Sequence, residues 1–232
     1  MQSLPEHYKA LIVGASGAIG SAMVTELQND PRCGTVIALG RETKPHIDYR
    51  DESSIAAAAS ELAHQGPFHL IVITTGMLHH GQHLPEKRLA QLNAEQMMEN
   101  FRINTMGPAL VIAKFAPLLV RNDRAIMAAL SAKVGSIGDN RLGGWYSYRA
   151  TKAALNMMIK TASIELARTH PKAVIAALHP GTVNSRLSAP FKGEQIGRPP
   201  ADAAYELLQV LDGLQPDVSG SFWAYNGQEL PW

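Results

Sequence analysis

Tyr148 and Lys152 lie four residues apart at the start of an alanine-rich segment that is expected to be helical. Residues at positions i and i+4 share one face of a helix, so the phenol and the ammonium can lean toward one ligand. A free tyrosine titrates near pH ~10, and a neighbouring cation lowers that pKa, as general acid–base chemistry at neutral pH requires. Tyr148 is the only one of the six tyrosines with a lysine four residues on. The pair therefore predicts a proton donor, with two solvated side chains on a helix surface as the alternative.

A glycine-rich loop is the second chemical feature. The apolar run at residues 10–13 is followed at once by the sequence GASGAIG at residues 14–20. Between a strand and a helix, such a loop lets backbone N–H groups and the helix N-terminus meet a pyrophosphate. The glycines fall at 14, 17 and 20, which departs from the usual Gly-x-Gly-x-x-Gly spacing. A tight turn with only a packing role is the alternative.

A serine near the middle of the chain could bind the reacting group. Ser131 ends the apolar run 124–130, and a hydroxyl at the carboxyl end of a parallel strand lies where open α/β sheets bind ligands. Ser136 is the competing candidate, since it precedes Tyr148 by twelve residues against seventeen for Ser131.

Asn104 lies in a segment that is expected to form a long helix from Asn93, with Gln96 three residues later as in a capping box. Pro108 has no N–H, so the Asn104 carbonyl loses its helical donor four residues on and must find another partner. The sequence therefore predicts an open carbonyl at Asn104, with a kinked packing helix as the alternative.

The elements that must position these groups follow from the apolar pattern. Continuous apolar runs, in place of alternating ones, indicate strands that are covered on both faces. They alternate with helical segments, which predicts a parallel, doubly wound sheet. We expect a single Rossmann-type α/β domain over residues 1–232, with a mostly parallel seven-stranded sheet flanked by helices. The expected strands are 10–13, 35–39, 46–48, 69–74, 124–130, 173–178 and about 219–227, and the expected helices include one ending near 29, one at 51–63 and one at about 148–170.

Composition argues against several other classes of protein. Lys and Arg number 21 against 20 Asp and Glu, so no net charge points to a nucleic acid or a membrane surface as partner. Cys33 is the only cysteine, which excludes an internal disulfide and argues against a structural zinc site. No apolar run approaches the ~18 residues of a membrane span, and the first residues do not resemble a secretion signal. We therefore expect a cytoplasmic protein without membrane or nucleic-acid partners.

His79, His80 and His83 form a cluster of imidazoles, a common kind of metal ligand. Glu86 is the only carboxylate near them in the sequence. A solvated loop or the lining of a substrate channel is the preferred interpretation, and no metal is predicted.

Over nearly its whole length the chain resembles the short-chain dehydrogenase/reductase family. Its glycine loop is similar to the family's Gly-x-x-x-Gly-x-Gly loop, in which Gly14, Ile19 and Gly20 match and the middle glycine is shifted from 18 to 17. Residues 74–76 (TTG) occupy the place of the family's Asn-Asn-Ala-Gly turn, and the family's strand asparagine is Ala128 here. The tail and residues 134–137 (VGSI) look like the C-factor and sniffer-like carbonyl reductase branch.

The resemblance implies a catalytic tetrad of Asn104, Ser131, Tyr148 and Lys152. Tyr148 would donate a proton to a carbonyl oxygen that Ser131 holds. Lys152 would lower the Tyr148 pKa and bind the nicotinamide ribose, and the Asn104 carbonyl would hold a water of the proton relay. Residues 126–131 (IMAALS) match the family's strand-end pattern, which favours Ser131 over Ser136.

The expected cofactor is NADP(H) in preference to NAD(H). An NAD site usually places an acidic residue at the end of the second strand, whereas Leu39 and Gly40 carry no carboxylate and Arg41 offers a charged fork suited to a 2′-phosphate. Glu42 is expected to point away from the ribose, and a solvated Arg41 is the alternative. The resemblance implies these cofactor-binding residues: Gly14, Ser16, Gly17, Ile19, Gly20, Arg41, Asp48, Thr74, Thr75, Gly76, Tyr148, Lys152, Pro180, Gly181, Val183 and Ser185.

The implied activity is reduction of a small-molecule aldehyde or ketone to an alcohol. The resemblance also implies a substrate lid at residues 185–200 and a homodimer or homotetramer. Two other functions stay open at this stage. One is a dinucleotide-binding regulator without turnover, and the other is a cell-signalling protein of the C-factor type that acts through a partner surface. The lid carries no recognisable code, so the sequence does not identify the substrate.

Overall fold

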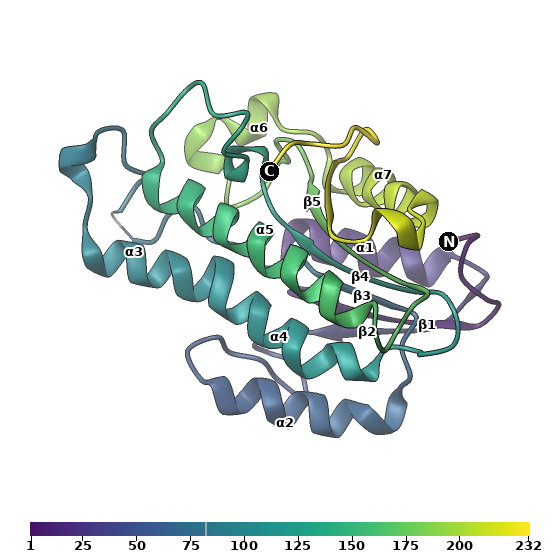
Figure 1. Ribbon diagram of the computed structural model, residues 1–232. Helices are drawn as coiled ribbons and strands as arrows, with labels where there is room; N and C mark the ends of the chain where they lie inside the picture. Colours follow the sequence, from purple (N-terminus) through teal and green to yellow (C-terminus); the bar gives the residue numbers. More distant parts are fainter. Residues whose placement is uncertain (82) are drawn as a thin grey trace.

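A parallel sheet forms the centre of the molecule (Figure 1). The computed structural model describes residues 1–81 and 83–232. Within these residues the sheet has six strands in the order β2-β1-β3-β4-β5-β6, and every neighbouring pair is parallel. The chain moves from β1 outward to β2 and then crosses to β3 on the other side of β1, so its winding direction reverses there. The strands are β1 (Tyr8–Val13), β2 (Cys33–Leu39), β3 (Leu70–Ile73), β4 (Ala125–Leu130), β5 (Ala173–His179) and β6 (Ser221–Ala224).

Helices cover both faces of the sheet because its strands are apolar on both sides. Along β1, Leu11 and Val13 belong to one core, whereas Ala10 and Ile12 belong to the other. The prediction of a doubly wound α/β domain is thereby confirmed. The first core is closed by α2 (Glu52–Leu62), α4 (Gly107–Phe115) and α5 (Tyr146–Leu166), and the second by α1 (Ala18–Asn29) and α7 (Pro200–Gly213) (Figure 1).

The prediction of a strand at residues 46–48 is wrong, and the described sheet therefore has six strands and not seven. The Ile47 N–H donates to the Gly40 carbonyl at 2.9 Å, and the Asp48 N–H donates to the Ser54 hydroxyl at 2.9 Å. This backbone is therefore bonded to the turn after β2 and to the first turn of α2, and not to a neighbouring strand. The last strand is present but shorter than predicted.

The helix that was expected from Asn93 is confirmed at its start and differs in its middle. The Asn93 side chain accepts from the Gln96 N–H at 2.9 Å, and α3 (Ala94–Phe101) follows. Residues Arg102–Met106 then widen into a π-helical turn before α4 begins. Such turns inside α-helices are frequent at functional sites.

The remaining elements depart from the predicted boundaries by a few residues. α5 begins at Tyr146, two residues earlier than expected, and ends at Leu166. A short helix, α6 (Gly193–Ile196), lies within the expected lid. No helix in the part of the chain that the structure describes combines the length and apolarity needed to cross a membrane.

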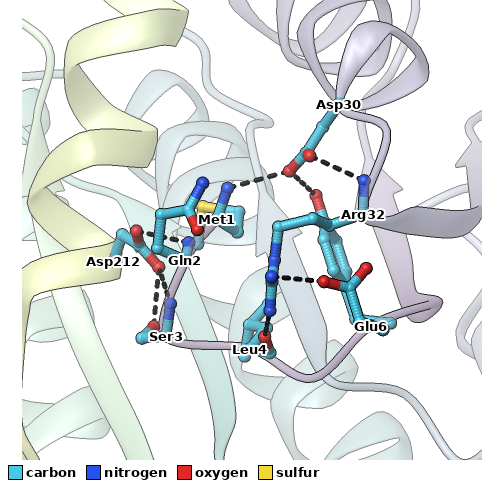
Figure 2. Close-up of polar contacts among 9 residues, drawn as sticks. Met1, Gln2, Ser3, Leu4, Glu6, Asp30, Arg32 and Asp212 are labelled. Carbon is cyan, nitrogen blue, oxygen red and sulfur yellow. Dashed lines mark hydrogen bonds and ion pairs between the residues drawn. The ribbon is translucent and has the colours of Figure 1, made fainter.

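Two carboxylates hold the first residues of the chain against the helices of one face (Figure 2). Asp30 Oδ2 accepts from the Met1 ammonium at 2.8 Å and from the Tyr8 hydroxyl at 2.7 Å. Asp212 Oδ1 accepts from the Ser3 N–H at 2.8 Å and from its hydroxyl at 2.6 Å. Because Asp30 follows α1 and Asp212 lies in α7, these bonds tie the first segment to both helices.

Gly107, at the start of α4, is predicted to tolerate no side chain. A Cβ there would lie 2.1 Å from Cδ2 of Tyr49, whose ring packs against the core. Gly107→Ala should therefore lower the free energy of unfolding by about 1–3 kcal/mol, the usual cost of overpacking, in urea denaturation. Gly213→Ala is the matched helical control, since nothing lies within 4 Å of a Cβ at that position. Equal effects of the two substitutions would contradict the prediction.

Candidate active site

The carboxyl ends of the central strands meet at one edge of the sheet, and predicted site residues follow them. Gly14 follows β1, Thr74 follows β3 and Ser131 follows β4. The Thr74 hydroxyl donates to the Val13 carbonyl at 2.9 Å, and the Gly14 N–H donates to the Leu39 carbonyl at 2.8 Å. These bonds join the ends of β1, β2 and β3, so the glycine loop lies beside the turn at residues 74–76.

Gly14 and Gly20 are required by close approach of the backbone. Gly14 has a φ of 88°, and a Cβ there would lie 2.8 Å from Cγ2 of Thr75. A Cβ on Gly20 would lie 2.4 Å from the carbonyl oxygen of Gly14. Gly17, the shifted glycine, has an ordinary φ of −76° and is the N-cap of α1. The shift therefore affects the cap of α1 and leaves the two sterically required glycines in place.

The start of α1 is suited to a phosphate group. Its N-cap makes no side-chain hydrogen bond, and its first turn contains no acidic residue. The first N–H groups of a helix lack intrahelical acceptors, and the helix dipole favours an anion there. The residues present thus fit the pyrophosphate of a dinucleotide, and the close packing at Gly14 and Gly20 holds the loop against the start of α1.

Tyr148 and Lys152 lie on the buried face of α5, with exposed fractions of 8% and 2%. Lys152 Nζ lies 5.8 Å from the centroid of the Tyr148 ring and donates to the Leu130 carbonyl at 2.8 Å. A Cβ on Gly76 would lie 3.7 Å from the same Nζ. Neither side chain is solvated, which excludes the surface alternative. The structure brings the pair together with the turn after β3.

The electrostatics of this pair differ from the sequence expectation. Burial raises the pKa of Tyr148 above its ordinary value and lowers the pKa of Lys152 to about 7. Desolvation disfavours the charged form of each group, the phenolate as well as the ammonium. Burial thus acts on the Tyr148 pKa in the direction opposite to that expected from a neighbouring cation, and the lowering of this pKa by Lys152 stays a prediction. Further charge or hydrogen bonds at the site are needed before Tyr148 gives up its proton readily.

Asn104 is fully buried, and its side chain clamps the turn after β3. Its Oδ1 accepts from the Met77 N–H at 2.8 Å, and its Nδ2 donates to the Met77 carbonyl at 2.7 Å. Pro108 was expected to leave the Asn104 carbonyl without a donor. Pro108 cannot donate to that carbonyl, and the π-type bond of this turn runs from the Gly107 N–H to the Arg102 carbonyl, five residues back. The water-binding role of the carbonyl therefore stays a prediction.

Ser131 and Ser136 are both buried, and they differ in what their hydroxyls do. The Ser131 hydroxyl donates to Asn156 Oδ1 at 2.6 Å, whereas the Ser136 oxygen accepts from the Asp139 N–H at 3.1 Å. In this arrangement Asn156 Oδ1 takes the Ser131 proton that a substrate carbonyl would otherwise accept. Mutagenesis can decide between the two serines.

Residues 185–200, the expected lid, lie against the turn after β3. A Cβ on Gly76 would lie 3.8 Å from Cδ1 of Leu187. A second contact joins the two segments, since Nε2 of His79 lies 3.3 Å from the carbonyl oxygen of Arg186. The segment is therefore close to the buried pair on α5, and its role as a lid stays a prediction.

The other residues that were predicted to bind the cofactor lie along the same edge. Arg41 and Ser16 are exposed, and Arg41 makes no ion pair with any residue that the structure describes. The Thr75 hydroxyl lies 2.9 Å from the Tyr49 hydroxyl, which faces it from the segment before α2. Pro180, Gly181, Val183 and Ser185 follow β5, and Asp48 and Ile19 are half-buried.

Trp145 and Phe191 are site residues that the sequence reasoning missed. The Trp145 ring lies 6.2 Å from the Tyr148 ring in an edge-on arrangement and 5.2 Å from the Phe191 ring. Phe191 also lies 6.3 Å from the His79 ring. The two glycines before Trp145 were the available signal, because they mark an unusual turn directly before the helix of Tyr148.

The histidine cluster closes a turn of the backbone. His80 and His83 exchange N–H···O bonds of 3.2 and 3.0 Å. Among the described residues, no group of three or more His, Cys, Asp or Glu is arranged to hold a metal ion. His79 instead contacts the Arg186 carbonyl in residues 185–200, and its place in a substrate channel stays a prediction.

Comparison with known proteins identifies the relatives of this chain. The family model described as short chain dehydrogenase matches residues 8–195. The 1-hydroxy-2-glutathionyl-2-methyl-3-butene dehydrogenase of Rhodococcus sp. (strain AD45) is 30% identical over 231 residues, which cover 96% of this chain and 98% of that protein. The C-signal protein of Myxococcus xanthus is 34% identical over 145 residues, 62% of this chain and 83% of that protein.

Two solved structures share the fold. The carbonyl reductase Sniffer of D. melanogaster has a TM-score of 0.82 at 21% identity and covers 98% of this chain and 100% of its own. The NADPH-bound carbonyl reductase from chicken fatty liver has a TM-score of 0.80 at 22% identity, with 99% and 100% covered. These two matches confirm the single-domain Rossmann-type fold. The family model and the C-signal match confirm the resemblance to the short-chain dehydrogenase/reductase family and to its C-factor members.

The lowered pKa of Lys152 predicts a stability that rises with pH. The folded-state value of about 7 lies below the ordinary 10.5, so between these pH values the unfolded chain binds the additional proton. The penalty of burying the ammonium is therefore fully present below pH 7 and is lost as the pH rises toward 10.5. In thermal denaturation without cofactor, the melting temperature of the unmutated protein relative to Lys152→Met should increase between pH 7 and pH 9. A pH-independent difference would contradict the shift.

Proposed function

The chain belongs to the short-chain dehydrogenase family, and we propose that it is an NADP(H)-dependent oxidoreductase that reduces an aldehyde or ketone to an alcohol. The observation that carries the proposal is the burial of Tyr148 and Lys152 beside Gly76, at the edge of the sheet where the glycine loop opens. A proton donor, a cation and a dinucleotide loop thus share one site. The cofactor would supply the hydride, and the chain would handle the proton and the substrate oxygen.

In this proposal Tyr148 gives its proton to the substrate oxygen, and Ser131 donates a hydrogen bond to that oxygen. Burial raises the pKa of Tyr148 and keeps the phenol protonated, so the bound cofactor and the Lys152 ammonium would have to lower this pKa for proton transfer to the substrate oxygen. Lys152 interacts with the ribose hydroxyls, which offset the desolvation of its ammonium. The carbonyl of Asn104 anchors the relay water.

The cofactor would lie across the carboxyl edge of the sheet. We assign its pyrophosphate to the loop at residues 14–20 and the start of α1, its adenosine half to Arg41 and Asp48, and its nicotinamide half to residues 74–76 and 180–185. The uncapped helix start and the close packing of Gly14 support the first assignment. The solved carbonyl reductase with bound NADPH supports a nicotinamide dinucleotide as the cofactor.

Residues 185–200 would act as the substrate lid, given their contacts with Gly76 and His79. We also propose that the chain forms a homodimer or homotetramer. Large apolar side chains are exposed on α3 and α5 and in the turn between α3 and α4, where a second copy would cover them. These residues are Met98, Met106, Met157, Met158 and Ile164.

A second candidate function is signalling or regulation through a partner surface. The observation that favours it is the 34% identity to the C-signal protein. A regulator that binds the cofactor without turnover would have no need for a buried phenol and ammonium beside the nicotinamide side of the site. Turnover and cofactor binding must therefore be measured separately.

Tyr148→Phe removes the proposed acid and is expected to lower kcat by about 10²–10⁴-fold, the usual contribution of general acid catalysis. Cofactor affinity should stay nearly unchanged, because the phenol ring remains in place. The measurement is a screen of carbonyl compounds with NADPH and NADH, followed at the nicotinamide absorbance. Tyr146→Phe is the matched control, since Tyr146 lies on the same helix two residues before Tyr148 and its side chain is exposed.

Ser131→Ala and Ser136→Ala separate the two serines in the same assay, and the larger loss of kcat is expected at Ser131. In the Tyr148→Phe variant, near-normal turnover would rule out Tyr148 as the proton donor. A larger loss at Ser136 would transfer the carbonyl-binding role to that residue.

Arg41→Ala is expected to weaken NADPH binding and leave NADH binding nearly unchanged. A charge-assisted contact to a phosphate is worth roughly 1.5–3 kcal/mol, which corresponds to about ten- to a hundredfold in affinity. Titration of each cofactor by fluorescence measures both constants. Lys172→Ala is the control, because this exposed cation precedes β5 at the opposite edge of the sheet. Equal affinities of the unmutated protein for the two cofactors would overturn the NADP(H) preference.

A further inference from the structure

Glu86 is a buried carboxylate at the start of the helix that carries Tyr148. Its exposed fraction is 2%, and it makes no ion pair within the part of the chain that the structure describes. One carboxylate oxygen accepts from the Ser147 hydroxyl, and the other accepts from the Ser147 N–H at 3.2 Å. The carbonyl of Glu86 accepts from the Trp145 N–H at 2.5 Å. Glu86 thus bonds to both residues on either side of the point where α5 begins.

α5 needs such a partner because its own N-cap supplies none. Trp145 is the N-cap and makes no side-chain cap hydrogen bond, and the first turn of α5 contains no acidic residue. An acceptor at this point satisfies N–H groups that have no intrahelical partner, and a negative charge there interacts favourably with the helix dipole. Glu86 provides both from a segment 61 residues earlier in the chain.

The turn that Glu86 holds is strained. Gly143, Gly144 and Trp145 have φ values of 62°, 64° and 52°, so three successive residues adopt the left-handed conformation. Trp145 carries a bulky side chain in a conformation that favours glycine, and such residues persist only where their surroundings impose them. The bond from Trp145 to the Glu86 carbonyl is one of those constraints. The same turn directs the indole edge-on toward the Tyr148 ring and beside Phe191.

We propose that Glu86 is a positioning residue for the proton donor. It acts through Ser147 and Trp145 and fixes the first turn of α5, so that the Tyr148 phenol and the Trp145 ring keep their places relative to the substrate oxygen. It does not touch the reacting atoms. The inference rests on the proposed function of Tyr148 as the acid, and it adds a residue that holds the acid in place.

A small displacement of Tyr148 is enough to matter. Misplacing a reacting group by about 1 Å can lower a rate by about 10²-fold. Among the described residues, Glu86 makes no hydrogen bond to the glycine loop or to residues 180–185. Cofactor affinity should therefore not depend on its side chain. Loss of the carboxylate should therefore reduce kcat and leave the cofactor dissociation constant unchanged.

Three substitutions separate the geometry from the charge. Glu86→Ala removes both side-chain bonds and should lower kcat by about tenfold or more. Glu86→Gln keeps two bonds, because its amide oxygen can accept from the Ser147 N–H and its amide nitrogen can donate to the rotatable Ser147 hydroxyl. It should retain kcat within about threefold, while Ser147→Ala, which keeps only the N–H bond, should fall between the two. Glu52→Ala is the control, since Glu52 lies in the first turn of α2, away from the site.

The experiment measures kcat and KM with the carbonyl compound found in the screen, NADPH affinity by fluorescence titration, and amide hydrogen exchange in the peptide that spans residues 143–152. The expected result is a loss of kcat in Glu86→Ala, faster exchange at the start of α5, unchanged NADPH affinity and recovery in Glu86→Gln. A lower melting temperature with an unchanged kcat would overturn the proposal, because Glu86 would then be merely structural. An equal loss of kcat in Glu86→Gln would also overturn it, since charge and not position would be the cause.

The two proposals fail in different ways. If the unmutated protein reduces no carbonyl compound but exchange at residues 143–152 accelerates in Glu86→Ala and not in Glu52→Ala, the proposed reaction is wrong and the anchoring of α5 holds. If turnover is present and Glu86→Ala changes neither kcat nor exchange, the reaction stands and the role of Glu86 is wrong. Should Glu86→Ala not fold, Ser147→Ala and Glu86→Gln give the same two readouts.

Discussion

The burial of Lys152 is the constraint on which the site depends. Its ammonium is almost fully removed from solvent and donates to the Leu130 carbonyl at 2.8 Å. Desolvation lowers its pKa to about 7, and a buried ammonium needs more acceptors than one carbonyl oxygen. The backbone packs tightly against the base of this side chain, since a Cβ on Gly135 would lie 2.7 Å from the Lys152 Cβ. The protein therefore buries an amine whose charged form is poorly solvated, and hydroxyl groups of a ligand would stabilise that form.

A continuous set of contacts links the glycine loop to the helix that carries Asn104. Cγ2 of Thr75 occupies the space that a Cβ on Gly14 would need. The Thr75 hydroxyl lies 2.9 Å from the Tyr49 hydroxyl. The Tyr49 ring in turn fills the space that a Cβ on Gly107 would occupy, directly after the π-helical turn. Asn104, within that turn, is clamped to the backbone after β3. The glycines at both ends of this set are required because the groups between them pack without space for another carbon atom.

The start of α5 is determined from outside the helix. The carboxylate of Glu86 supplies the cap that Trp145 does not, and the left-handed turn before α5 places the indole between Tyr148 and Phe191. Phe191 belongs to residues 185–200, the proposed lid, so this segment and the start of α5 meet through aromatic rings. This arrangement joins the segment that can select a substrate to the turn that holds the proposed acid.

The sequence by itself determined the parallel sheet, the glycine loop and the pairing of Tyr148 with Lys152. Each of these features shows in a few consecutive residues, as an apolar run, as glycines after a strand or as an i,i+4 spacing. Local chain geometry is therefore sufficient to predict them. Tertiary structure alone decided that residues 46–48 bond to the turns around them and form no strand. It also decided that burial raises the pKa of Tyr148, because a charged neighbour is visible in the spacing whereas burial is not. The anchoring of α5 by Glu86 joins positions 61 residues apart, and only folding brings such positions into contact.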